Sequence, residues 1–235
     1  MSTSFDFQGR VVLVTGASGA LGSAIAAAFD DAGATVCGAD IVAPEDEESL
    51  VDPDVVDYYR GDFTDEDDVA GVVESVVDTH GGIDHLCAVA GTWRGGDPIH
   101  ETDTETFDFL FDVNCKTMFL AAKHALPHLQ AREGSVVSVA SRSSLSGGAG
   151  DGPYRASKAA VRLLTETVAA ENEGVVRANA VMPSVIDTPM NRDMMSGADH
   201  DAWVDPADIA RTVMALCSDA TPVTSGAAVP VYGES

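Results

Sequence analysis

Short apolar runs alternate with longer, helix-like segments along nearly the whole chain. The short runs are rich in valine and other β-forming residues, whereas the apolar residues of the longer segments recur at helical spacing. Strands are expected at residues 10–18, 34–40, 55–62, 83–91, 134–141, 175–183 and 227–233. Helices are expected at residues 20–33, 64–81, 104–129, 152–173 and 205–219. Strands that alternate with helices predict a parallel sheet with helices on both faces.

The chain shows no internal boundary. No linker, low-complexity stretch or repeat interrupts its 235 residues, which suit one domain spanning residues 1–235. No apolar run approaches the roughly 18 residues of a membrane span. The first residues, MSTSFDFQGR, lack the basic-then-apolar pattern of a signal peptide. We therefore expect a cytoplasmic protein with no membrane segment.

Cysteine and histidine positions do not favour a disulfide or a metal site. Cys37, Cys87, Cys115 and Cys217 lie far apart and form no C-x-x-C pair, which is typical of buried thiols in a reducing compartment. The segment HALPH holds two histidines four residues apart, but no glutamate follows the first, and a proline disturbs the turn. The acidic clusters lack the D-x-D-x-D-G order of a calcium loop. No metal is expected.

The charge balance changes the picture of the surface. The chain carries 38 acidic and 13 basic residues, a formal net charge of −25, and the acidic residues are spread over its whole length. Such a charge disfavours a nucleic-acid partner, because nucleic acids present phosphates. It also destabilises a compact state unless salt screens the repulsion. This composition resembles that of proteins from salt-loving microbes; an acidic protein of an ordinary cytoplasm is the alternative.

A glycine cluster lies between the first expected strand and the first expected helix. The segment TGASGALG places Gly16, Gly19 and Gly22 at this turn, where glycines allow a close backbone approach and the helix start offers N–H groups to a pyrophosphate. Asp40 ends the second strand, where a carboxylate accepts the hydroxyl hydrogens of an adenosine ribose and repels a 2′-phosphate. Asp62, after the third strand, is expected at the adenine edge. These positions predict a dinucleotide site that prefers NAD.

Tyr154 and Lys158 are four residues apart in PYRASK, directly after the glycine-rich run SGGAGDG. On the helix expected there, this spacing puts both side chains on one face. A free tyrosine has a pKa of about 10 and a nearby ammonium favours the phenolate, so a lowered pKa is expected for Tyr154. The alternative is a surface lysine beside a half-buried tyrosine.

Six motifs occur in a fixed order between residues 9 and 233: TGASGALG, VNCKTMF, GSVVSVAS, YRASK, VRANAVMP and IDTPM. In order and spacing they resemble the motifs of the short-chain dehydrogenase/reductase family. The resemblance implies a single Rossmann-type, doubly wound α/β domain with a seven-stranded parallel sheet. It implies hydride transfer between a nicotinamide cofactor and a small alcohol or carbonyl substrate. A homodimer or homotetramer is implied on the same ground.

By position, the resemblance implies four catalytic residues. Ser141 corresponds to the catalytic serine, Tyr154 to the acid/base, and Lys158 to the partner that also binds the nicotinamide ribose. Asn114 corresponds to the asparagine that holds a relay water through a local helix distortion. The cofactor contacts expected from the turn, from Asp40 and from the resemblance are Gly16, Ser18, Gly19, Ala20, Leu21, Gly22, Asp40, Ile41, Asp62, Phe63, Ala90, Gly91, Tyr154, Lys158, Pro183, Ile186 and Thr188.

Three positions depart from the family pattern. The fourth strand ends in AVAG, so Ala88 and Val89 stand where the family commonly has two asparagines. The side-chain hydrogen bonds with which those asparagines brace the cofactor loop are therefore not expected here. Ser184 replaces a glycine after the proline of the sixth strand, and Tyr232 replaces a common aspartate.

Residues 187–204 are expected to form a short lid over the substrate. This segment resembles that of dihydropteridine reductases, which share D-T-P-M-N-R and the tyrosine–lysine pair but lack the serine. The presence of Ser141 argues against simple equivalence. Candidate substrate contacts are Trp93, Arg94, Arg142, Met190 and Trp203. An NAD-dependent alcohol or carbonyl oxidoreductase is the leading hypothesis; a pterin-type reductase and a non-catalytic NAD-binding protein are the alternatives.

Overall fold

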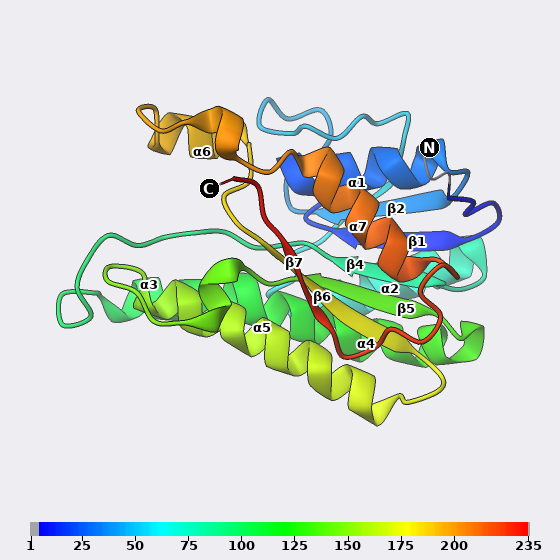
Figure 1. Ribbon diagram of the computed structural model, residues 1–235. Helices are drawn as coiled ribbons and strands as arrows, with labels where there is room; N and C mark the ends of the chain where they lie inside the picture. Colours follow the sequence, from blue (N-terminus) through cyan, green and yellow to red (C-terminus); the bar gives the residue numbers. More distant parts are fainter. Residues whose placement is uncertain (1–4, 235) are drawn as a thin grey trace.

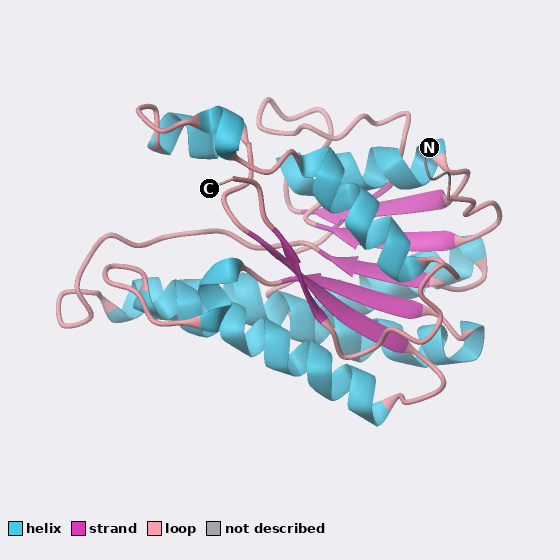
Figure 2. Ribbon diagram, viewed as in Figure 1, coloured by secondary structure: helices cyan, strands magenta, loops and turns pink. Residues whose placement is uncertain are grey.

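The computed structural model describes residues 5–234 and contains one seven-stranded sheet (Figures 1 and 2). All neighbouring strands pair in parallel, in the order β3-β2-β1-β4-β5-β6-β7. The strands are β1 (Val11–Thr15), β2 (Thr35–Asp40), β3 (Asp57–Arg60), β4 (His85–Ala88), β5 (Ser135–Val139), β6 (Arg177–Pro183) and β7 (Ala228–Val231). The predicted seven-stranded parallel sheet is confirmed.

Helices cover both faces of this sheet (Figure 1). One face carries α1 (Ala20–Asp31) and α7 (Pro206–Cys217), and the other carries α2 (Glu66–His80), α4 (Thr117–Arg132) and α5 (Gly152–Glu171). Two separate apolar layers result, because side chains alternate along each strand. In β1, Leu13 packs into the layer of α2, α4 and α5, whereas Val12 and Val14 pack into the layer of α1 and α7.

The long helix expected at residues 104–129 is interrupted. It consists of α3 (Thr104–Leu110), a π-helical turn at Phe111–Lys116 and then α4. Two short helices within the expected lid, α6 (Pro189–Met194) and a 3₁₀ turn at His200–Ala202, were not predicted. They are too short to show a periodic apolar pattern.

The crossover between β1 and β4 positions the functional site. The connections from β1 run outward to β2 and β3, while the chain from β4 onward builds the opposite half of the sheet. At such a switch point, the loops after adjacent strands diverge and leave a crevice beyond the carboxyl ends of the strands. Among residues 5–234, no helix is long and apolar enough to cross a bilayer, and no group of His, Cys, Asp or Glu is arranged to hold a metal ion.

Candidate active site

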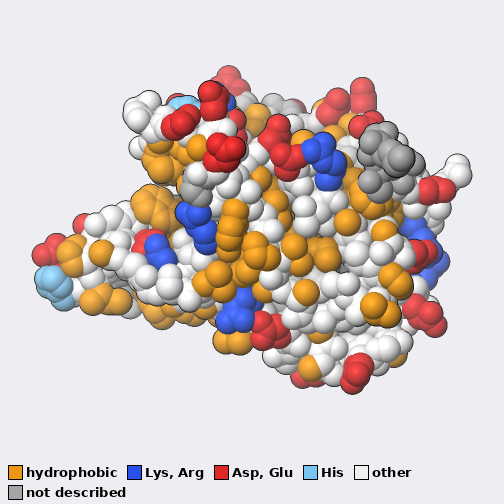
Figure 3. Space-filling view, in the orientation of Figure 1, with side chains coloured by type: hydrophobic (Ala, Val, Ile, Leu, Met, Phe, Trp, Pro, Cys, Tyr) orange, Lys and Arg blue, Asp and Glu red, His pale blue; other side chains and the backbone are white. Residues whose placement is uncertain are grey.

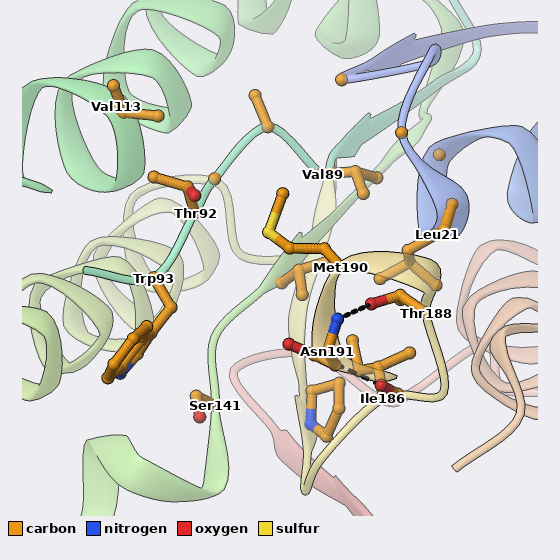
Figure 4. A pocket seen from close by; sticks show the side chains of 18 of the residues that line it. Leu21, Val89, Thr92, Trp93, Val113, Ser141, Ile186, Thr188, Met190 and Asn191 are labelled. Atoms are coloured by element: carbon orange, nitrogen blue, oxygen red, sulfur yellow. Dashed lines mark hydrogen bonds between the residues drawn. The ribbon is translucent and has the colours of Figure 1, made fainter. Parts of the chain in front are cut away.

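A cavity of about 1170 Å³ lies at this switch point. It is bounded by the loops that follow β1, β2, β4, β5 and β6 and by the segment around α6. Figure 4 shows Trp93 and Ser141 on one side of the cavity, with Ile186, Thr188 and Asn191 on the other. The cavity is large enough for a dinucleotide and a small substrate together.

The glycine turn after β1 forms the floor of the cavity at the start of α1. Gly16 has φ +69°, and a Cβ placed on it would lie 2.8 Å from the Cα of Ala90. A Cβ on Gly22 would lie 2.0 Å from the carbonyl oxygen of Gly16. Gly19 precedes α1 and no side chain caps its first turn, so the free N–H groups of this helix start suit a pyrophosphate.

Asp40 presents its carboxylate at the end of β2. Oδ2 accepts from the Ser18 backbone N–H at 3.0 Å, and Oδ1 accepts from the Val42 N–H at 3.1 Å. A carboxylate has about four acceptor sites, so both oxygens keep capacity for ribose hydroxyls. The acidic residues that line this end of the cavity are Asp40, Glu47, Glu48 and Asp62.

Thr15 braces the loop that lacks the usual asparagines. Its Oγ1 accepts from the backbone N–H groups of Val89 at 3.1 Å and Ala90 at 3.3 Å. The loop after β4 is therefore tied to the end of β1 although Ala88 and Val89 offer no polar side chain. Spacing along the chain does not predict this contact, because the two segments are more than seventy residues apart.

Ser141 and Tyr154 come from different elements and interact directly. Ser141 precedes a 3₁₀ turn at Arg142–Leu145, and its Oγ accepts from the Ser143 N–H at 3.1 Å. Burial raises the pKa of Tyr154, and the side-chain hydrogen bond with Ser141 lowers it in part. The expected lowering of the pKa of Tyr154 is therefore wrong in this structure, because burial outweighs the stabilising contacts.

Lys158 is buried one turn after Tyr154 on α5. Its ammonium donates to the Val139 carbonyl at 3.0 Å, and burial lowers its pKa to about 8. Asn114 lies beside it in the π-helical turn, only 1% exposed. The Asn114 Oδ1 accepts from the Thr92 N–H at 2.7 Å, and its Nδ2 donates to Ser157 Oγ at 3.0 Å. The helix distortion expected at Asn114 is present.

The segment around α6 forms the wall opposite Ser141. Thr188 caps α6 by accepting from the Asn191 N–H at 3.2 Å, and the Asn191 side chain donates to the Ile186 carbonyl at 2.8 Å. The Met190 side chain extends from this wall toward Thr92 (Figure 4). Pro183, Ile186 and Thr188 all line the cavity.

Comparison with known proteins identifies the family. Residues 16–233 match the family described as Enoyl-(Acyl carrier protein) reductase. The chain is 34% identical over 241 residues to 3-oxoacyl-(acyl-carrier-protein) reductase FabG of Thermotoga maritima, covering 96% of this chain and 97% of that protein. It is 33% identical to (+)-borneol dehydrogenase 2 of Salvia officinalis, covering 96% of this chain and 88% of that protein. The chain belongs to the short-chain dehydrogenase/reductase family.

Solved structures of short-chain dehydrogenases superpose closely on this one. A short-chain dehydrogenase/reductase of Brucella melitensis gives a TM-score of 0.88 at 28% identity, covering 97% of both chains. The ligand-free aldohexose dehydrogenase of Thermoplasma acidophilum gives 0.86 at 28% identity, covering 97% of this chain and 92% of that one. Like its family, this oxidoreductase uses a nicotinamide cofactor, NAD or NADP, and acts on alcohols or carbonyls.

Most of the expected site residues of this short-chain dehydrogenase line the cavity. Two lie just behind it: Ser18 supports Asp40, and Asn114 stands beside Lys158. Two others turn elsewhere. The guanidinium of Arg94 lies 4.0 Å from the centre of the Phe109 ring, and Trp203 is buried with its ring 4.3 Å from that of His200. Neither of these two lines the cavity.

Several lining residues were not anticipated. Their shared feature is that they lie in loops or short helices, where spacing does not indicate which side chains face inward. They include Glu47, Glu48, Leu50, Thr92, Val113, Asn191, Met194 and Met195. Motifs offered a signal for Val113, which begins VNCKTMF, for Asn191, which lies within DTPMNR, and for the two methionines, which follow that motif after one residue.

Proposed function

We propose that this protein is an NAD(H)-dependent oxidoreductase that interconverts a small alcohol and its carbonyl compound, with Tyr154 as the acid/base. The observation that carries the proposal is the convergence of Ser141, Tyr154 and Lys158 on the cavity that also contains the glycine turn. The cavity thus combines a glycine turn suited to a dinucleotide, Tyr154 as the proton donor, and the Ser141 hydroxyl, which is hydrogen-bonded to Tyr154.

The proposed mechanism assigns one step to each side chain. A bound nicotinamide supplies or accepts the hydride. In the reducing direction, the Ser141 hydroxyl donates a hydrogen bond to the carbonyl oxygen, and Tyr154 gives its proton to that oxygen as the carbon gains hydride. The Lys158 ammonium stabilises the phenolate that remains and binds the nicotinamide ribose. Solvent then returns a proton to Tyr154 through a relay water that Asn114 holds.

The charges around the cavity support NADH over NADPH. Asp40, Glu47, Glu48 and Asp62 surround the adenosine end, whereas the lysine and arginine among the lining residues, Lys158 and Arg142, lie at the catalytic end. A 2′-phosphate would therefore meet several carboxylates, and Arg60, which is paired with Asp40 in the sheet, is not among the residues that line the cavity. Ile41 and Phe63 provide the apolar surface for the adenine.

The other half of the cavity favours a compact substrate with an apolar body. Trp93, Val113, Met190, Met194 and Met195 line it beside Ser141. Two relatives are named for borneol and for cis-4-hydroxycyclohexanecarboxylate, which makes cyclic alcohols the first compounds to screen. We further propose that residues 187–204 act as the lid over this half.

The proposed setting is a salt-rich cytoplasm and a homodimer or homotetramer. Four free thiols suit a reducing compartment. Acidic side chains are scattered over the face of the molecule seen in Figure 3, with few basic ones between them. Phe107, Phe119 and Leu163 on α3, α4 and α5 are each at least 44% exposed, and they offer an apolar surface for a second copy.

The test is a dehydrogenase assay with NAD in molar KCl, on a panel of cyclic and open-chain alcohols, sugars and acyl thioesters. Tyr154→Phe should lower kcat by about 10²–10⁴-fold, because the proton donor is lost. NADH binding, followed by fluorescence, should stay close to that of the wild type. Near-normal turnover in Tyr154→Phe would show that the acid/base is assigned wrongly.

A further inference from the structure

Arg155 directly follows Tyr154 and joins three points of the preceding loop to α5. Its Nε donates to Asp151 Oδ1 at 2.6 Å, and its Nη1 donates to the Ser146 carbonyl at 3.1 Å. Between these points the guanidinium lies against Gly148, where an added Cβ would lie 2.4 Å from its Cζ and 2.5 Å from its Nη2. Both ends and the middle of residues 146–151 are therefore held by one side chain.

The same loop is held from its other side by the segment after β4. The Gly96 N–H donates to the Gly150 carbonyl at 2.6 Å. A Cβ on Gly95 would lie 2.8 Å from that carbonyl oxygen and 3.1 Å from Trp93 Cζ2. Gly150 has φ +83°, a conformation that favours glycine. Because Gly95 lies between the Gly150 carbonyl and the Trp93 ring, this loop also positions Trp93, which lines the cavity.

Residues 146–151 also connect the two catalytic hydroxyls. The chain leaves Ser141 through the 3₁₀ turn, passes through this loop and enters α5 two residues before Tyr154. A loop that contains three glycines is costly to order, because glycine loses the most conformational freedom on folding. A guanidinium that makes two directed hydrogen bonds, one to each end of the loop, supplies the restraint that the glycines lack.

We propose that Arg155 is a positioning residue, which fixes Tyr154 relative to Ser141 and Trp93 by clasping residues 146–151. This inference rests on the proposed role of Tyr154 as the acid/base. Lysine would not replace it, because a single ammonium cannot reach Asp151 and the Ser146 carbonyl in the fixed geometry of the guanidinium fork.

The ion pair also sets the charge beside Tyr154. The negative charge of Asp151 raises the pKa of Tyr154, and the positive charge of Arg155 lowers it. The other polar group that acts on this phenol is the Ser141 hydroxyl; Lys158 lies one helical turn away on α5, with its ammonium bonded to the Val139 carbonyl. Since the two charges of the pair oppose each other, removing either one leaves the other uncompensated. The two single variants should therefore shift the pKa in opposite directions.

The first experiment measures the loop without any substrate. In a Trp203→Phe background, Trp93 is the remaining tryptophan of the chain. Acrylamide should quench its fluorescence more strongly in Arg155→Gln and Arg155→Lys than in the parent. The matched control is Arg162→Gln, which removes another arginine of α5 that pairs four residues away, with Glu166 at 2.5 Å. It should leave the quenching unchanged.

The second experiment measures the phenol. Tyrosinate absorbance is titrated in each variant and in the same variant carrying Tyr154→Phe, so that the difference reports Tyr154 alone. The midpoint should move to higher pH in Arg155→Gln, to lower pH in Asp151→Asn, and stay near the parent value in Arg155→Lys. In the alcohol assay, the loosened loop of Arg155→Lys should still lower turnover by about 10- to 100-fold.

These results separate the two hypotheses. If the Arg155 variants match Arg162→Gln in quenching and in midpoint, the positioning role is overturned, whatever the activity of Tyr154→Phe. If Arg155→Gln fails to fold, the opposite shift in Asp151→Asn and the quenching of Arg155→Lys still decide the question. Full turnover in Tyr154→Phe would overturn the proposed function, while stronger Trp93 quenching would still support the clasp.

Discussion

Asn114 and Lys158 converge on the same side of Gly91. A Cβ built on Gly91 would lie 2.8 Å from the Oδ1 of Asn114 and 2.8 Å from the Nζ of Lys158. The two polar atoms come from different helices, the π-helical turn and α5. Because Gly91 has no side chain, both polar atoms can approach the loop after β4 at this position.

Gly91→Ala should impair catalysis and also lower stability. The atoms that a new methyl would meet belong to two buried side chains, so moving them aside also disturbs the hydrogen bonds of Asn114 to the Thr92 N–H and of Lys158 to the Val139 carbonyl. Displacing them by about 1 Å should lower kcat by roughly 10²-fold. Gly71→Ala is the control, since nothing lies within 4 Å of its Cβ position. Equal turnover of the two variants would contradict this account of the site.

Cofactor choice should depend on Asp40. Two like charges about 4 Å apart at an effective dielectric of 20 repel by roughly 4 kcal/mol, and salt reduces this. We expect kcat/KM to favour NADH by about 10- to 100-fold, a difference of roughly 1.4–2.7 kcal/mol. Asp40→Asn should reduce the preference, and Asp54→Asn, outside the cavity, should not. A wild-type preference for NADPH would refute the assignment.

Ser141→Ala distinguishes an alcohol dehydrogenase from a pterin reductase. If the substrate is an alcohol or ketone, Ser141 holds the oxygen on which charge develops, and its loss should lower kcat by about 10²–10³-fold. Reduction of a quinonoid dihydropterin needs no such clamp. Robust NADH-dependent pterin reduction that survives Ser141→Ala, with no alcohol or ketone turned over, would favour the pterin alternative.

Stability should rise steeply with salt. The net charge of −25 is screened over about 3 Å in molar salt but over about 30 Å at 0.01 M. The Tm should therefore increase from millimolar to molar KCl, as followed by circular dichroism. Sucrose at matched osmolality, which does not screen charge, should raise the Tm much less. An equal effect of both solutes would point to solute exclusion instead of charge screening.

His85 should make the fold sensitive to acid. It begins β4, is 7% exposed and lies 2.8 Å from Ser135 Oγ through Nδ1, and burial lowers its pKa from 6.5 to about 4. Between these two values the unfolded chain binds a proton that the folded chain does not, so the free energy of unfolding falls as the pH falls.

The loss should amount to about 3 kcal/mol between pH 6.5 and 4. His85→Gln keeps a polar partner for Ser135 but does not titrate. Its free energy of unfolding, measured by denaturant at several pH values in fixed salt, should decrease less on acidification than that of the wild type. Parallel pH curves for the two proteins would contradict the burial argument.

Local pattern predicted the sheet well, because its central strands are buried on both faces and read as short runs rich in valine. The pattern did not predict the direction in which the side chain of a loop residue points. Arg94 and Arg142 both stand next to expected site residues, yet Arg94 turns to Phe109 and Arg142 lines the cavity. Spacing along a loop does not determine this, since the ring that attracts Arg94 is fifteen residues away.

Contacts between segments that are distant along the chain could not be predicted from the sequence either. Thr15 was part of the glycine motif in the sequence, but its role in bracing Val89 and Ala90 follows from the pairing of β1 with β4. The clasp of Arg155 depends on the path of a glycine-rich loop, which residue type alone does not fix. Motif positions indicated the family, which the comparisons confirm, whereas the packing of loops determines the surroundings of the site.

The π-helical turn makes the site depend on the length of the chain as well as on its side chains. A regular helix advances roughly 100° per residue, and a turn closed by i→i+5 bonds holds one residue more than its neighbours. Excising one residue between Phe111 and Lys116 would restore the regular repeat and leave the helical phase of the two flanking segments unchanged, so that Met118 keeps its place in the apolar layer. Within the turn, however, the remaining residues would be redistributed over a regular repeat, and Asn114 would lose its position beside Lys158. A single-residue deletion in this turn therefore removes one contact of the site while the packing of the helices on either side is kept.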